Sequence, residues 1–198
     1  MRKYSLPYNV ISLANGTGKF NITPKDTRGK GNKKTIHRPK KDAYTPHVMA
    51  GVDKLRAEGY TGAGINIAII DTGIDYNHPD LGGCFGPGCK ATHGYDFVGD
   101  HYTGDNDPVP DDDPYDNCVG HGTHVAGIIA ASATEQDYFV GVAPNVTLGA
   151  YRVLGCEGGV SNDVLIKAFL MAYESSADVI TSSIGSLGGW SEGIPSSV

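Results

Sequence analysis

One histidine and one aspartate are the residues best placed to do chemistry. Residues 120–127 read Gly-His-Gly-Thr-His-Val-Ala-Gly and lead into the apolar run 128–131. This pattern predicts a helix that begins at His121, whose small residues let its backbone pack closely against a neighbour. An imidazole at the start of a helix can act as a general base if a carboxylate orients it and a nucleophile lies nearby. The carboxylate candidate is Asp71, which follows the strand-like run 65–70.

The strand before Asp71 is predicted from its composition, because residues 65–70 are apolar except for Asn66. Such a run is typical of a parallel strand covered on both faces. In open α/β sheets, functional side chains gather at the carboxyl ends of strands, which is where Asp71 falls.

Three further elements are predicted after the histidine: a strand over 146–154, a helix over 161–175 and a strand over 179–184. This order indicates a right-handed crossover in a parallel sheet. The predicted fold class is therefore α/β, with a partial doubly wound parallel sheet. The apolar stripe that the 161–175 helix should bury consists of Leu165, Ala168, Phe169, Ala172 and Tyr173.

The folded part is expected to begin with a helix over 45–59. Thr45 is a capping residue, Pro46 suits the first helical position, and Gly59 ends the segment. Between them, apolar residues recur at helical spacing: Val48, Val52 and Leu55.

Four segments together resemble the subtilases, the subtilisin-like serine proteases of peptidase family S8. Residues 69–75, Ile-Ile-Asp-Thr-Gly-Ile-Asp, resemble the aspartate motif, and residues 120–127 resemble the histidine motif. Residues 141–154 and 178–185 resemble the strand after the histidine helix and the substrate-binding strand. Asp-Thr-Gly alone also occurs in aspartic proteases, but joined to Gly-His-Gly-Thr-His it is specific.

The resemblance covers about 46–192 and implies the N-terminal portion of a subtilisin-like fold. Residues 82–89, Gly-Gly-Cys-Phe-Gly-Pro-Gly-Cys, resemble large secreted subtilases of the minor extracellular protease type. The family match makes Asp71 and His121 catalytic, requires no cofactor, and gives Asp80 the position of a structural calcium ligand. It also implies that a polypeptide substrate binds as an added strand along Ser183, Ile184 and Gly185, facing Gly158 and Gly159.

The family's nucleophile is missing from these residues. It stands in a Gly-Thr-Ser-Met-Ala motif, and no Gly-Thr-Ser occurs in the 198 residues. The family's oxyanion asparagine is also expected beyond Val198. Losing one oxyanion donor costs roughly 3 kcal/mol, and losing the triad costs about a millionfold in rate. We therefore expect a C-terminally truncated sequence, divergent over 193–198 and inactive alone. The alternative is a non-catalytic, subtilase-like protein that binds peptides.

Charge divides the chain. Residues 1–45 hold 11 Lys and Arg against two acidic residues, and the remainder holds 5 against 20. The basic segment has no sustained apolar period and is interpreted as a linker, or as the tail of the family's inhibitory N-terminal propeptide. Nucleic-acid binding is disfavoured because aromatic residues do not interleave with its charges.

Cysteines and sequons favour a secreted glycoprotein. Asn15, Asn21 and Asn145 begin N-glycosylation sequons, although the N-terminus has no signal peptide and we expect one to precede it. The absence of an apolar run long enough for a membrane span disfavours membrane insertion. We expect a disulfide between Cys84 and Cys89, whereas the two other cysteines, Cys118 and Cys156, pair or stay free. Zinc is disfavoured because the cysteines and histidines lack ligand spacing.

An acidic loop lies between Gly104 and Asn117, with several prolines among its carboxylates. It is interpreted as a solvated surface loop. The alternatives are a calcium site and, because the family places the loop's end near the substrate, a preference for basic peptide side chains. The carboxylates are Asp105, Asp107, Asp111, Asp112, Asp113 and Asp116.

Overall fold

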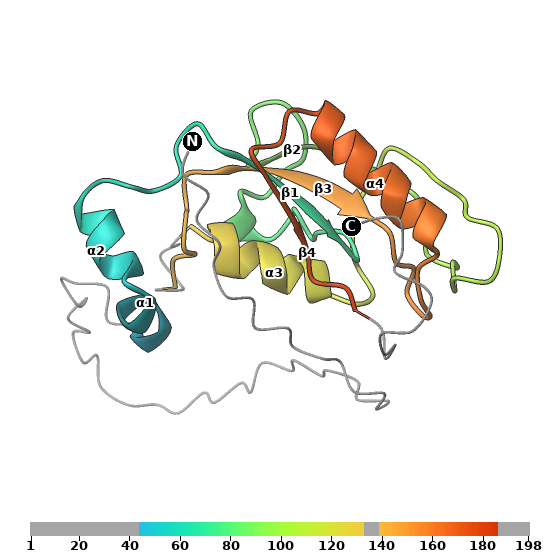
Figure 1. Cartoon of the computed structure of the whole chain (residues 1–198), viewed down its shortest axis with the longest axis horizontal. Helices are drawn as coiled ribbons and strands as arrows, with labels where there is room; N and C mark the ends of the chain where they lie inside the picture. Colours follow the sequence, from blue (N-terminus) through green and yellow to red (C-terminus); the bar gives the residue numbers. More distant parts are fainter. Residues whose placement is uncertain (1–43, 133–138, 186–198) are drawn as a thin grey trace, which may run out of the picture.

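The computed structural model describes residues 44–132 and 139–185 (Figure 1). Four parallel strands form one sheet in the order β2-β3-β1-β4. The expected α/β class with a parallel sheet is therefore confirmed. The strands are β1 (Asn66–Asp71), β2 (Ala91–Asp96), β3 (Thr147–Arg152) and β4 (Val179–Ser182).

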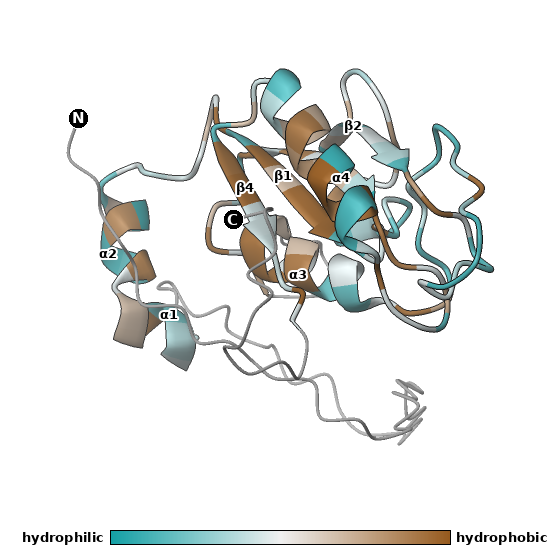
Figure 2. Ribbon diagram, turned by 45° about the vertical axis from the view of Figure 1, so that its right-hand side comes forward, coloured by the Kyte–Doolittle hydropathy of each residue, from teal (hydrophilic) through white to brown (hydrophobic). Residues whose placement is uncertain are grey.

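Two helices cover opposite faces of this sheet (Figure 1): α3 (His121–Ala130) and α4 (Asn162–Glu174). Alternate residues of β1 explain the arrangement. Ile69 packs in one core cluster with residues of α3, and Ile70 packs in the other with residues of α4. Both isoleucines are almost fully buried, and each contributes roughly 2 kcal/mol by leaving water. The apolar character of β1 is visible along most of its length in Figure 2.

The edge strand β2 was not predicted. Its sequence, Ala-Thr-His-Gly-Tyr-Asp, lacks both an apolar run and a clean alternation. At Gly94 a side chain is excluded, since a Cβ there would lie 2.0 Å from the carbonyl oxygen of Ala150 on β3. The pairing of β2 with β3 therefore depends on a contact that sequence periodicity does not reveal.

The predicted N-terminal helix is two short helices, α1 (Thr45–Ala50) and α2 (Val52–Ala57). Gly51 breaks them apart with a left-handed φ of 75°. Of the three apolar residues at helical spacing, Val52 is buried, whereas Val48 and Leu55 are about half exposed.

Most of the core stripe predicted for α4 is confirmed. Ala168 and Ala172 are buried as expected, and Val164 joins them. Tyr173, which was expected in the core, is 76% exposed. Leu165 and Phe169 are partly buried and pack against the same core cluster, so the prediction is wrong for Tyr173 alone among its five residues.

Several predictions fall outside the described residues, among them the sequons at Asn15 and Asn21 and the divergent segment 193–198. Almost all of the basic segment 1–45 lies outside them as well. Across 44–132 and 139–185, no helix has the length and apolar character that crossing a bilayer requires.

Two disulfides join all four cysteines. Cys84 pairs with Cys89 as expected, and Cys118 pairs with Cys156, which decides the pairing left open by the sequence. The first bond closes a loop of separation 5, and the second closes one of separation 38. By loop entropy they stabilise the fold by about 2 and about 4 kcal/mol.

We therefore predict unequal effects from removing the two bonds. Replacing Cys118 and Cys156 together by Ala should lower the free energy of unfolding by about 2 kcal/mol more than replacing Cys84 and Cys89 together. Denaturant titration of the two double variants measures the difference. Equal losses would show that loop length does not govern the contribution of these bonds.

Candidate active site

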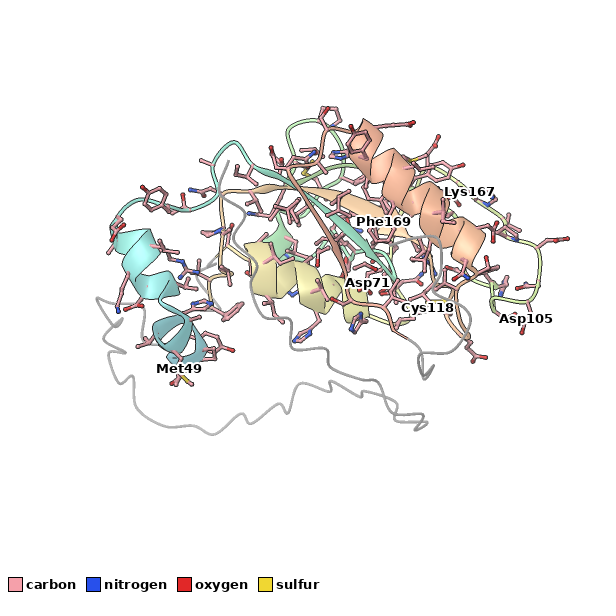
Figure 3. The ribbon with its side chains drawn as sticks, in the orientation of Figure 1. Met49, Asp71, Asp105, Cys118, Lys167 and Phe169 are labelled. Carbon is pink, nitrogen blue, oxygen red and sulfur yellow. A yellow bond between two sulfur atoms is a disulfide. The ribbon has the colours of Figure 1, made fainter. Side chains whose placement is uncertain are left out.

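Asp71 and His121, the two residues singled out from the sequence, are in direct contact. Asp71 ends β1 and His121 begins α3, and their Oδ1 and Nδ1 atoms lie 2.7 Å apart. The Asp71 side chain is 1% exposed and that of His121 is 33% exposed. Figure 3 shows Asp71 between the sheet and α3. A buried carboxylate thus meets an imidazole that still reaches the surface.

The contact determines which imidazole nitrogen is available. A carboxylate only accepts hydrogen bonds, so Nδ1 of His121 is the donor and Nε2 of the neutral ring keeps its lone pair. Asp71 Oδ1 also accepts a 2.7 Å hydrogen bond from the backbone N–H of Thr72. Its other oxygen, Oδ2, is buried and has no hydrogen-bond partner within the described part of the chain. Such an arrangement can take up a proton at Nε2 and stabilise the resulting charge.

Two hydrogen bonds join the segment after Asp71 to the first turn of α3. The N–H of Gly122 donates to Thr72 Oγ1 at 2.9 Å, and the N–H of Asp75 donates to Thr123 Oγ1 at 2.7 Å. The backbones also touch, because a Cβ on Gly122 would lie 2.1 Å from the carbonyl oxygen of Gly73. A glycine at 122 is therefore a steric requirement of the Asp71–His121 contact.

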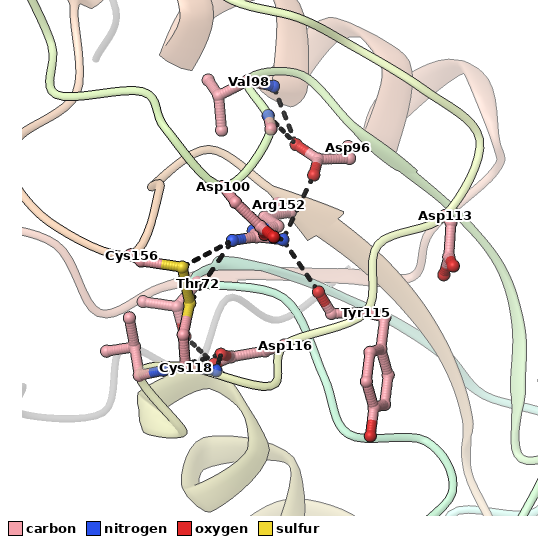
Figure 4. A network of polar contacts seen from close by, with 12 residues as sticks. Thr72, Asp96, Val98, Asp100, Asp113, Tyr115, Asp116, Cys118, Arg152 and Cys156 are labelled. Carbon is pink, nitrogen blue, oxygen red and sulfur yellow. Dashed lines mark hydrogen bonds and ion pairs between the residues drawn. A yellow bond between two sulfur atoms is a disulfide. The ribbon is translucent and has the colours of Figure 1, made fainter.

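Asp116 lies beside the segment that enters α3 (Figure 4) and is 2% exposed. It accepts a 2.6 Å hydrogen bond from Thr72 Oγ1 and further bonds from the N–H groups of Cys118, Val119 and Gly120. The surface-loop interpretation is thus wrong for this residue. The other carboxylates of the acidic loop are exposed: Asp105, Asp107, Asp111, Asp112 and Asp113.

Arg152 is a second buried group that sequence reasoning missed. Its Nη1 lies 2.8 Å from Asp100 Oδ1 and 3.4 Å from Asp96 Oδ2, and it donates to the carbonyl oxygen of Tyr115. Its Nη2 faces both sulfurs of the Cys118–Cys156 bond (Figure 4). Burial raises the pKa of Asp96, although hydrogen bonds from the N–H groups of Gly99 and Val98 and the charge of Arg152 oppose this. Arg152 therefore ties the disulfide to the end of β2.

The predicted peptide-binding residues lie on segments that leave the sheet beside Asp71. Ser183, Ile184 and Gly185 follow β4, whose Ser182 pairs with Ile70 of β1. The loop after β3 carries Gly158 and Gly159, and the N–H of Gly159 donates to the carbonyl oxygen of Thr103. Because β3 and β4 both flank β1 and run parallel to it, the two segments leave the sheet at the carboxyl ends of the strands, where Asp71 lies.

Asp80 lies in a short 3-10 helix, η1 (Pro79–Leu81), and is 9% exposed. Its Oδ1 is buried and has no hydrogen-bond partner in the described residues. It also lines a hollow of about 900 Å³ beside α3. The three-donor group found among the described residues lies elsewhere, at Asp100, Cys118 and Cys156. Because its cysteines form a disulfide, that group offers no thiolate.

Comparison with known proteins agrees with the motifs. The model of the Subtilase family matches residues 62–198. The minor extracellular protease Vpr of Bacillus subtilis (strain 168) is 41% identical over 169 residues, covering 83% of this chain and 20% of that protein. Thermitase of Thermoactinomyces vulgaris is 37% identical over 148 residues, covering 73% of this chain and 47% of that protein. The chain thus spans less than half the length of either relative.

One solved structure, sphericase, is 32% identical with a TM-score of 0.49. It covers 65% of this chain, which in turn covers 39% of the sphericase chain.

Two glycines of α3 provide a matched test of the close contact. Gly122→Ala should break the His121–Asp71 hydrogen bond and lower the melting temperature by several degrees, because its Cβ collides with Gly73. Gly127→Ala meets nothing within 4 Å and should leave stability unchanged or raised, since alanine favours a helix. Thermal unfolding of both variants gives the comparison. Equal melting temperatures would contradict the steric requirement at 122.

Proposed function

The chain belongs to the subtilase family, and on that premise we propose that it is the N-terminal portion of a serine endopeptidase with an Asp/His/Ser triad. The observation that carries the proposal is the 2.7 Å contact between His121 Nδ1 and the buried carboxylate of Asp71. The peptidase domain begins at residue 46 and includes residues up to 192. Residues 1–45 are a linker or the tail of an inhibitory propeptide.

In this mechanism, His121 is the base and then the acid. Its Nε2 takes the proton of a serine hydroxyl as the serine oxygen attacks the carbonyl carbon of the peptide bond. Asp71 holds the ring in place and stabilises the imidazolium. The imidazolium then gives its proton to the leaving amine. No Gly-Thr-Ser occurs in the 198 residues, so the proposal requires a serine from outside them, and these residues alone should not turn over substrate.

The substrate is a polypeptide held as an extended strand. Backbone groups of Ser183–Gly185 on one side and Gly158–Gly159 on the other bind it, and alternate side chains enter pockets. The position of both segments at the carboxyl edge beside Asp71 supports this assignment.

We propose that the protein is secreted, on the basis of its two disulfides and one exposed sequon. Both disulfides suit an oxidising compartment, and the sequon at Asn145 lies in an exposed turn where it can be glycosylated. The names of the relatives do not agree on location, since one is a minor extracellular protease and another is an intracellular serine protease.

A non-catalytic, subtilase-like peptide-binding protein is the second candidate. The 198 residues include the segments that the family match assigns to peptide binding, whereas the family's nucleophile motif is not among them. Such a protein would keep the peptide groove and bind substrate without hydrolysing it.

The two candidates are separated by measuring peptide hydrolysis by the intact protein, meaning the form that its source produces rather than the 198 residues alone, and by two histidine variants of that form. His121→Ala should lower kcat by about a millionfold, as loss of a triad base does. His124→Ala, one turn further along α3 and exposed, should leave kcat unchanged. Peptide binding without any turnover by the unmodified protein would instead support the binding function.

We also propose that Asp80 binds a structural calcium ion, because its buried Oδ1 has no other partner among the described residues. Calcium should raise the melting temperature of the protein, and a chelator should reverse the rise. Asp80→Asn should abolish the response, whereas Asp105→Asn in the acidic loop should keep it. Loss of the response in Asp105→Asn alone would assign the ion to the acidic loop.

A further inference from the structure

We propose that Asp116 is a positioning residue, which acts through Thr72 to hold His121 and Asp71 in contact. Its meaning for catalysis depends on the proposed protease function, but its effect on His121 can be observed without turnover. Within the described residues, Asp116 makes no hydrogen bond or ion pair with His121 or Asp71, so its effect on them passes through Thr72 and residues 118–120.

The surroundings of Asp116 are those of a carboxylate that organises its neighbours. It is 2% exposed, and the described residues provide hydrogen-bond donors rather than a cation to compensate its charge. Oδ1 accepts from the N–H groups of Cys118 and Val119 at 3.1 and 2.9 Å. Oδ2 accepts from the N–H of Gly120 at 2.8 Å and from Thr72 Oγ1 at 2.6 Å. A buried charge with this many donors fixes their positions.

Three of these donors, the N–H groups of residues 118–120, belong to the segment that directly precedes His121. Gly120 precedes His121 and is the N-cap of α3, with a left-handed φ of 80°. Holding the three consecutive N–H groups sets the direction in which the chain enters the helix. The position of the imidazole depends on that direction, because His121 is the first residue of α3.

The fourth donor reaches the other residue of the pair. The Thr72 hydroxyl has one hydrogen, which it donates in the hydrogen bond to Asp116. Its oxygen therefore has a lone pair free to accept the hydrogen bond from the N–H of Gly122. The N–H of Thr72 donates to Asp71 Oδ1, the oxygen that binds His121. A shift of Thr72 would therefore move both the start of α3 and a donor to that oxygen.

Asparagine cannot replace this carboxylate without conflict. Its amide has one acceptor oxygen and one NH2 group, whereas each oxygen of Asp116 accepts at least one backbone N–H. In either amide orientation, an NH2 group would face a backbone donor. The Cys118–Cys156 disulfide holds the same segment independently, so the Asp116→Asn variant should still fold.

The experiment uses the intact protein with labelled histidine and measures the ring nitrogen chemical shifts of His121, assigned by comparison with His121→Ala. Asp116→Asn and Thr72→Val should both move these shifts towards a mixture of tautomers, because Nδ1 loses its fixed acceptor. Thr72→Ser keeps the hydroxyl and should resemble the unmodified protein. Asp112→Asn, an exposed residue of the same loop with the same charge change, should have no effect.

Activity and coupling complete the test. In both disruptive variants kcat should fall about 10- to 100-fold while KM changes less than about twofold. The double variant should be little worse than either single one, because both changes act through one connection. Unchanged His121 shifts in Thr72→Val and in folded Asp116→Asn would overturn the proposal, as would an equal change in Asp112→Asn. If the form that the source produces shows no turnover, the protease proposal fails, and the His121 shifts still decide whether Asp116 positions His121.

Discussion

The contact between the start of α3 and the end of β1 is the constraint on which the rest of this structure depends. Gly122 approaches the carbonyl oxygen of Gly73 so closely that no side chain fits between them. Further along the same helix, Ala126 and Ala130 are fully buried against the sheet. Small residues thus bring a whole helix close to the sheet, and the short distance between Asp71 and His121 is a consequence of that packing.

Much of the fold could be predicted because its central elements have strong local patterns. The apolar run of β1 and the small residues of α3 each specify one structure, and the structure agrees with both. The strand β2 was not predicted because its mixed sequence has no strand pattern of its own and forms a strand by pairing with β3. The break between α1 and α2 at Gly51 was also not predicted, because the spacing of the apolar residues does not reveal a glycine with a left-handed φ.

The candidate site was predictable where one motif contains the chemistry and not where distant residues must meet. Asp71 and His121 each stand in a recognisable segment. Asp116 and Thr72 are 44 residues apart, and Arg152 contacts a disulfide whose cysteines are 38 residues apart. Composition placed Asp116 among solvated carboxylates, because a sequence shows neighbours along the chain but not the donors that folding brings together.

The position of β1 in the middle of the sheet has a consequence for synthesis. Its partners come late, since Asn66 pairs with Thr147 and Ile67 pairs with Val179. The most apolar strand of the sheet therefore leaves the ribosome well before either neighbour exists. Until β3 and β4 emerge, β1 is an unpaired apolar segment of the kind that aggregates or recruits chaperones. When the first strand of a parallel sheet lies between later strands, the sheet cannot form until those later strands have been synthesised.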